Sequence, residues 1–132
     1  MTDAHASPGD HVEIRVPADS AYLAILRTAT AGIAARMNFT IDDIEDLRIA
    51  VDEASSLLLA AAADGTQLTC RFDIDDDTLQ VVVSVPSDHG EPPQPGTFAW
   101  TVLTALAGEV DAASTGDTVT VTLRKSRVVA GE

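Results

Sequence analysis

The sequence is poor in basic residues. Its 132 residues include 8 Lys and Arg against 21 Asp and Glu, which gives a formal net charge of −13. This balance repels phosphate backbones and anionic membrane surfaces, so we predict that neither nucleic acid nor a membrane is a direct partner. A basic protein surface is the partner that such a charge favours.

Cysteine, aromatic residues and long apolar runs are also scarce. The single Cys70 can form no internal disulfide and cannot build a metal site, which suits a reducing cytoplasm. No apolar run is long enough to cross a bilayer, and the N-terminus has no signal-peptide pattern. Aromatic residues make up only 4% of the chain, but apolar residues reach 45%, which is enough for one compact domain with a core.

The stretch from Ile41 to Ala63 has the strongest helical pattern. Thr40 is placed to cap its N-terminus, acidic residues fill its first turns, where the helix dipole favours them, and Gly65 follows its end. One apolar face is formed by Ile44, Leu47, Val51, Ala54, Leu58 and Ala61. Glu53 lies at the border of this face, where a carboxylate is either solvated or beside a group that needs it.

The remaining elements follow from their periodicity. Alternation over His11–Val16 predicts a strand ended by Pro17, and helical spacing from Ala21 to Met37 predicts a helix. Further strands are expected at Gln67–Ile74, Leu79–Val85, Val110–Ala113 and Val119–Leu123. A short apolar helix is expected at Phe98–Ala107, with Phe98 and Trp100 packed in the core.

Two helices followed by a meander of strands predict an α+β fold. We expect a two-layer sandwich of a mixed, mostly antiparallel sheet with helices on one face. A single domain is expected over residues 11–125, with tails at 1–10 and 126–132.

Two loops deserve comparison with known sites. Asp75–Asp77 forms a hairpin turn and lacks the ligand spacing of a calcium loop, and the three histidines have no metal-ligand spacing, so we predict no metal site. The loop from Pro86 to Gly96 is long and rich in proline and glycine, which is typical of a binding loop or a lid.

The first half of the chain carries a recognisable pattern. A strand ending in Pro17-Ala18 leads to a helix bearing Leu26-Arg27, and residues 46–54 follow the order Asp-Leu-x-x-Ala-Val-x-Glu-Ala. In these residues the sequence resembles bacterial anti-sigma-factor serine kinases of the RsbW and SpoIIAB type, which belong to the GHKL (Bergerat-fold) ATPases. The resemblance implies a Bergerat fold, a homodimer and a nucleotide site beside the second helix.

The resemblance also assigns roles on that helix. Members of this family carry a Glu that acts as general base and, four residues later, an Asn that binds magnesium. Glu53 matches the Glu, whereas Leu57 stands at the Asn position, and a leucine side chain has no lone pair for a hard cation. Phosphoryl transfer depends on magnesium to neutralise the phosphates, so this departure predicts impaired transfer even where ATP still binds.

The loop motifs of the family are only partly present. Of the Asp-x-Gly-x-Gly motif that contacts the adenine, Asp88 and Gly90 remain, but Pro92 replaces the second glycine. Of the Gly-rich lid that cradles phosphates, Gly96 remains. The loop contains no basic residue. We therefore treat Asp88, Gly90 and Gly96 as a degenerate ATP site.

These residues are compatible with two functions. The first is an anti-sigma factor in a stress response, which sequesters an alternative sigma factor of RNA polymerase and is released by an anti-anti-sigma (STAS) partner. The second is an active serine kinase that phosphorylates this STAS partner, with Glu53 as base. A third possibility is an unrelated helix-and-sheet domain, in which Glu53 is solvated and Asp88-His89-Gly90 is a simple turn. Leu57 and the acidic balance favour the first.

Overall fold

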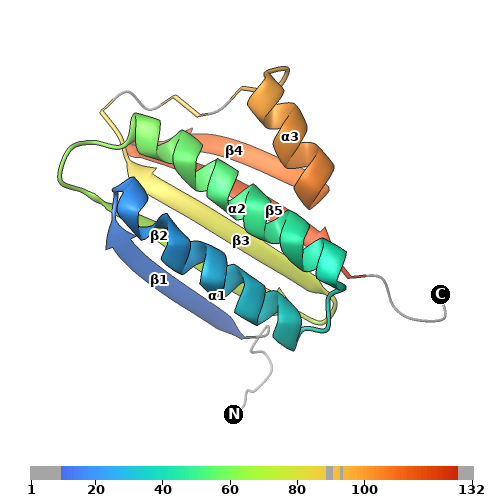
Figure 1. Cartoon of the computed structure of the whole chain (residues 1–132). Coiled ribbons are helices and arrows are strands. Elements are labelled where there is room, and N and C mark those ends of the chain that lie inside the picture. Colours follow the sequence, from blue (N-terminus) through green and yellow to red (C-terminus); the bar gives the residue numbers. More distant parts are fainter. Residues whose placement is uncertain (1–9, 89–90, 93, 128–132) are drawn as a thin grey trace, which may run out of the picture.

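A computed structural model describes residues 10–88, 91–92 and 94–127. The strands are β1 (His11–Pro17), β2 (Gln67–Asp75), β3 (Thr78–Pro86), β4 (Glu109–Thr115) and β5 (Thr118–Ser126). The helices are the 3-10 helix η2 (Ser20–Tyr22) and the α-helices α1 (Leu23–Arg36), α2 (Ile41–Ala61) and α3 (Phe98–Ala107). Figure 1 shows the three α-helices on one face of one sheet, which confirms the two-layer α+β sandwich.

The sheet has the strand order β1-β2-β3-β5-β4, and all four neighbouring pairs are antiparallel. β3 is central, and β1 and β4 form the two edges. The alternation that predicted these strands places every second side chain against the helices. In β3 those inward residues are Leu79, Val81, Val83 and Val85, all fully buried.

Helix α2 lies at the centre of the helical layer because its apolar face covers the middle of the sheet. Leu47, Val51, Ala54 and Leu58 are fully buried, and each large side chain contributes roughly 1.5–3 kcal/mol of transfer free energy. Helix α1 packs along one flank of α2 and α3 along the other. A residue on either flank of α2 therefore lies between α2 and one neighbouring helix.

Several predicted boundaries move by a turn or less. The first helix begins with η2, because the Asp19 side chain caps that segment by accepting from the Ala21 N–H at 2.9 Å. The second ends at Ala61, since Ala62 has extended backbone. Ser126, expected in the tail, is the last residue of β5, whereas residues 1–9 and 128–132 lie outside the described part of the chain.

One prediction about the core was wrong. Phe98 is 85% exposed, because it occupies the first turn of α3, ahead of the buried residues Leu103 and Ala107. Trp100 is half-buried. Within the residues described, no helix is both long and apolar enough to span a membrane.

Candidate functional site

The two flanks of α2 have different neighbours. On one flank Asp52 accepts a hydrogen bond from Arg27 of α1, with an Nη1–Oδ1 distance of 2.7 Å. On the other flank, Asp43 and Asp46 approach Lys125 of β5, which also contacts α3. Residues three or four positions apart share a helix face, so Glu53 and Leu57 continue the flank of Asp46 and lie on the side of α3.

Glu53 and Leu57 are both half-buried there, one turn apart. Leu57 packs against the hydrophobic core. Glu53 makes no hydrogen bond or ion pair with any residue in the described ranges. The predicted pair is therefore held together on one flank, with an aliphatic side chain directly beside the carboxylate.

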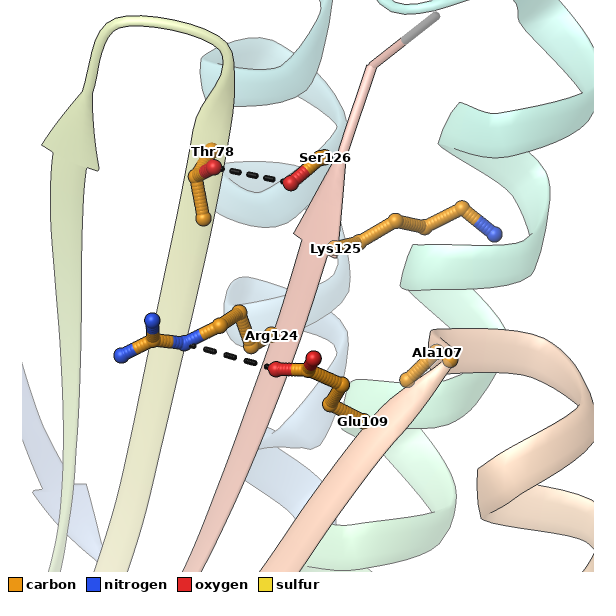
Figure 2. A pocket seen from close by; sticks show the side chains of 7 residues that line it. Thr78, Ala107, Glu109, Arg124, Lys125 and Ser126 are labelled. Carbon is orange, nitrogen blue, oxygen red and sulfur yellow. Dashed lines mark hydrogen bonds and ion pairs between the residues drawn. The ribbon is translucent and has the colours of Figure 1, made fainter.

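Lys125 is a site residue that sequence reasoning missed. Its side chain is 16% exposed, and its Nζ donates to the Leu106 carbonyl at 2.8 Å and lies 3.5 Å from Asp43 Oδ1 and 3.9 Å from Asp46 Oδ2. Figure 2 shows it extending from β5 toward α2, away from Arg124 of the same strand. Lys125 thereby ties the C-terminal end of α3 to the first turns of α2, and no local pattern in the sequence signals this contact.

The loop after β3 starts at the C-terminal end of α2. The Ala63 N–H donates to the Pro86 carbonyl at 2.9 Å, and the Ser87 N–H donates to the Asp117 carbonyl at 2.7 Å. Asp88 follows and is exposed, whereas Gly90 lies outside the described residues. Figure 1 shows the loop passing from this end of α2 to the start of α3.

Gly96 closes the loop just before α3. Its φ of +91° is a left-handed conformation that favours glycine, and a Cβ there would meet no atom within 4 Å. Thr97 then caps the helix, since its Oγ1 accepts from the Trp100 N–H at 3.2 Å. The structure thus places Asp88 and Gly96 at the two ends of the loop that begins beside α2.

These residues do not fit a magnesium-bound nucleotide. Leu57 offers no ligand atom, and the described loop side chains include the carboxylates of Asp88 and Glu91 but no cation. Triphosphate placed here would face negative charge without the neutralisation that phosphoryl transfer needs.

Cys70 is unsuited to nucleophilic chemistry. It lies in β2, facing the helices, and is fully buried. Burial raises the pKa of its thiol from the ordinary value of 9.0 to about 12, so the reactive thiolate is scarce near neutral pH. The thiol therefore serves as a core side chain.

Residues 16–125 match the family described as the histidine kinase-like ATPase domain. The chain belongs to this family. The RsbW and SpoIIAB resemblance seen in the sequence agrees with it. The match begins at the end of β1 and ends in β5, so it includes α2, the loop and α3.

This histidine kinase-like ATPase domain is similar to serine-protein kinases of the RsbW type. It is 38% identical over 82 residues to the serine-protein kinase RsbW of Bacillus velezensis, covering 60% of this chain and 51% of that protein. It is 36% identical over 104 residues to the RsbW of Bacillus mycoides, covering 77% of this chain and 60% of that protein. The chain thus spans only about half to three fifths of these relatives.

Solved structures share the fold of this domain. The RsbU and RsbW domains of Rv1364c from Mycobacterium tuberculosis match 92% of this chain and 33% of that one, with a TM-score of 0.72 and 17% identity. A histidine kinase from Burkholderia phymatum matches 94% of this chain and 74% of that one, with a TM-score of 0.54 and 16% identity. At these identities the likeness concerns the fold alone.

Proposed function

We propose that this chain is an anti-sigma factor that binds and sequesters an alternative sigma factor, is released by an anti-anti-sigma (STAS) partner, and has weak or absent kinase activity. The similarity to RsbW proteins supports the regulatory role. The observation that carries the proposal is Leu57, an aliphatic side chain packed against the core where magnesium would need a ligand.

The charge of the chain supports a basic protein partner. The first turns of α2 carry the exposed Asp42 and an ion pair between Glu45 and Arg48. The chain as a whole has a net charge of −13. Sigma factors present basic surfaces that contact DNA, and an acidic partner steers such a surface into the encounter complex.

Binding assays test the proposal directly. We expect the chain to form a stable complex with a sigma factor of its source organism in a pull-down, and calorimetry with and without magnesium to show no magnesium-dependent binding of ATP. Failure to bind any sigma factor of that organism would contradict the sequestering role. Tight ATP binding that requires magnesium would instead favour the kinase.

A single substitution distinguishes a nucleotide site that lacks only the magnesium ligand from a site that lacks further binding groups. We expect Leu57→Asn to leave ATP binding weak, because the loop still presents Asp88 and Glu91 and no described cation. The matched control is Leu59→Asn, which places the same amide at another half-buried position of α2, on the flank that faces α1. A magnesium-dependent gain in ATP affinity for the first variant alone would show that one ligand was all that the site lacked.

An active serine kinase is the second candidate, and Glu53 favours it. This carboxylate is half-buried and has no ion-pair partner among the described residues, as a general base would require. Incubation of a STAS partner with ATP and magnesium tests it. Phosphate incorporation that Glu53→Gln abolishes would establish the kinase, and we expect no incorporation.

A further inference from the structure

Strand β4 forms an edge of the sheet whose outer side is unpaired in the described structure. At the two ends of β5, the Asp117 carbonyl accepts from the Ser87 N–H and the Arg127 N–H donates to the Asp77 carbonyl, so the odd-numbered residues of β5 bond toward β3. Because backbone groups alternate in direction along a strand, the even-numbered residues of β5 bond to the odd-numbered residues of β4. Three residues of β4 therefore direct their backbone N–H and C=O groups outward: Val110, Ala112 and Ser114.

The open face of this edge is acidic. The Glu109 side chain is 78% exposed, and its Oε1 lies 3.8 Å from Arg124 Nε on the neighbouring strand, as Figure 2 shows. The Asp111 carboxylate is exposed and has no hydrogen-bond or ion-pair partner among the residues that the structure describes. Both acids line a hollow of about 350 Å³, together with Gln80 and Thr122. A cationic side chain in this hollow would meet a carboxylate that the described fold leaves unpaired.

The helical side of the same edge is apolar and incompletely covered. Val110 and Ala112 pack against the core but remain half-buried, and so does Leu106 of α3. Helix α3 leads into β4 through Gly108, and none of its ten residues is charged. Figure 1 shows α3 and β4 on the same side of the molecule. Apolar side chains added along the outer side of β4 would cover Val110 and Ala112 further.

The two faces of the edge specify what can pair with it. Side chains alternate along a strand, so a strand added at β4 would direct every second side chain toward Glu109 and Asp111, and the others toward Val110 and Ala112. Basic residues suit the first set and apolar residues the second. A second copy of β4 does not suit, because pairing about Ala112 would bring no basic residue opposite either acid, and a net charge of −13 repels a copy.

We propose that the outer edge of β4 binds an extended segment of a basic partner protein as a sixth strand of the sheet, and that basic and apolar residues alternate in this segment. The outward backbone groups of β4 supply the hydrogen bonds, as in other complexes in which a peptide extends a sheet. The carboxylates of Glu109 and Asp111 select the basic residues. The inference goes beyond the proposed function, because it assigns a binding surface that requires neither a sigma factor nor a nucleotide.

Two labelled peptides test this surface. The probe has about eight residues, in which lysine and valine alternate, and the matched peptide has the same composition with its lysines and valines in two separate blocks. Fluorescence anisotropy at roughly 0.15 M NaCl measures the dissociation constant of each. We expect the alternating peptide to bind about tenfold more tightly or better, because only alternation directs every lysine to the acidic face.

Substitutions in β4 locate the contact. Ala112→Pro removes an outward N–H without touching the bonds to β5, and should weaken binding of the alternating peptide about tenfold or more. Ser114→Pro acts in the same way at the next outward N–H, and serves if the first variant does not fold. Asp111→Lys should also weaken binding, because a cation then faces the lysines. The charge control is Asp64→Lys, an exposed loop position that should leave the constant within about twofold of the wild type.

Hydrogen exchange followed by NMR reports the pairing directly. With saturating alternating peptide, the outward amides of Val110, Ala112 and Ser114 should exchange about tenfold more slowly or less, because they become hydrogen-bonded. The amides of the exposed Asp64 and Gly65 should exchange at an unchanged rate. Attraction between a cationic peptide and an acidic chain without strand pairing would not give this pattern. Circular dichroism confirms that each variant is folded.

Any of three results overturns the proposal. These are an alternating peptide that binds no more tightly than the block peptide, folded proline and Asp111→Lys variants that bind it as the wild type does, or unchanged exchange at the three outward amides. None of these results bears on sigma binding or on ATP, so failure here is distinct from failure of the proposed function.

Discussion

At the scale of single residues, Cys70 makes the stability of the fold sensitive to alkaline pH. Its pKa is about 12 in the folded chain and 9.0 for an unperturbed thiol, so the folded state disfavours the thiolate. The resulting stabilisation is fully present below pH 9 and is lost as the pH rises toward 12. We predict that the free energy of unfolding, measured by urea titration between these values, falls more steeply for the wild type than for Cys70→Val.

The comparison with the valine variant isolates the thiol, because tyrosine and lysine titrate in both proteins. Equal slopes for the two chains would contradict the prediction. The folded protein should also react slowly with a thiol reagent at neutral pH and quickly once unfolded, since the side chain is fully buried.

Single residues also mark how far the sequence could predict the site. The spacing of Glu53 and Leu57 on one helix could be predicted from the sequence because helical periodicity is local. The contacts of Lys125 could not be predicted, because its partners Leu106, Asp43 and Asp46 come from two other elements and only the folded chain brings them together. The wrong expectation for Phe98 had the same origin, because apolarity alone does not show which turn of a helix the core covers.

At the scale of elements, the N-cap of α2 is a discrete source of stability. Thr40 Oγ1 accepts from the Asp43 N–H at 3.1 Å, and its backbone is extended as a cap requires. We predict that Thr40→Ala lowers the free energy of unfolding by about 1 kcal/mol, measured by urea or thermal unfolding. The control is Thr28→Ala on the exposed face of α1, which should change it by less than about 0.5 kcal/mol.

Equal effects of the two threonine substitutions would show that the cap contributes nothing. The elements themselves were predictable from the sequence because Thr40, the apolar face of α2 and the alternation of the strands act locally. Their ends were less predictable. Asp19 starts a 3-10 turn and Ala62 leaves the helix, and both depend on weak backbone preferences that neighbouring contacts decide.

At the scale of the whole molecule, the net charge of −13 should make the proposed association with a sigma factor sensitive to salt. Association with a basic sigma factor is steered by long-range attraction, so we predict that its rate constant falls about tenfold between roughly 50 and 500 mM NaCl. Stopped-flow fluorescence measures this rate. A salt-independent rate would contradict a partner chosen by charge.

The position of β1 in the strand order has a consequence for synthesis of the chain. β1 is synthesised before the other described strands, but β2, the strand to which it pairs, follows only after α1 and α2. At ordinary translation speeds the newborn strand therefore waits several seconds before the segment that completes it is made. During that interval both of its sides are open, and nearby ribosomes on one messenger would hold other such strands within reach.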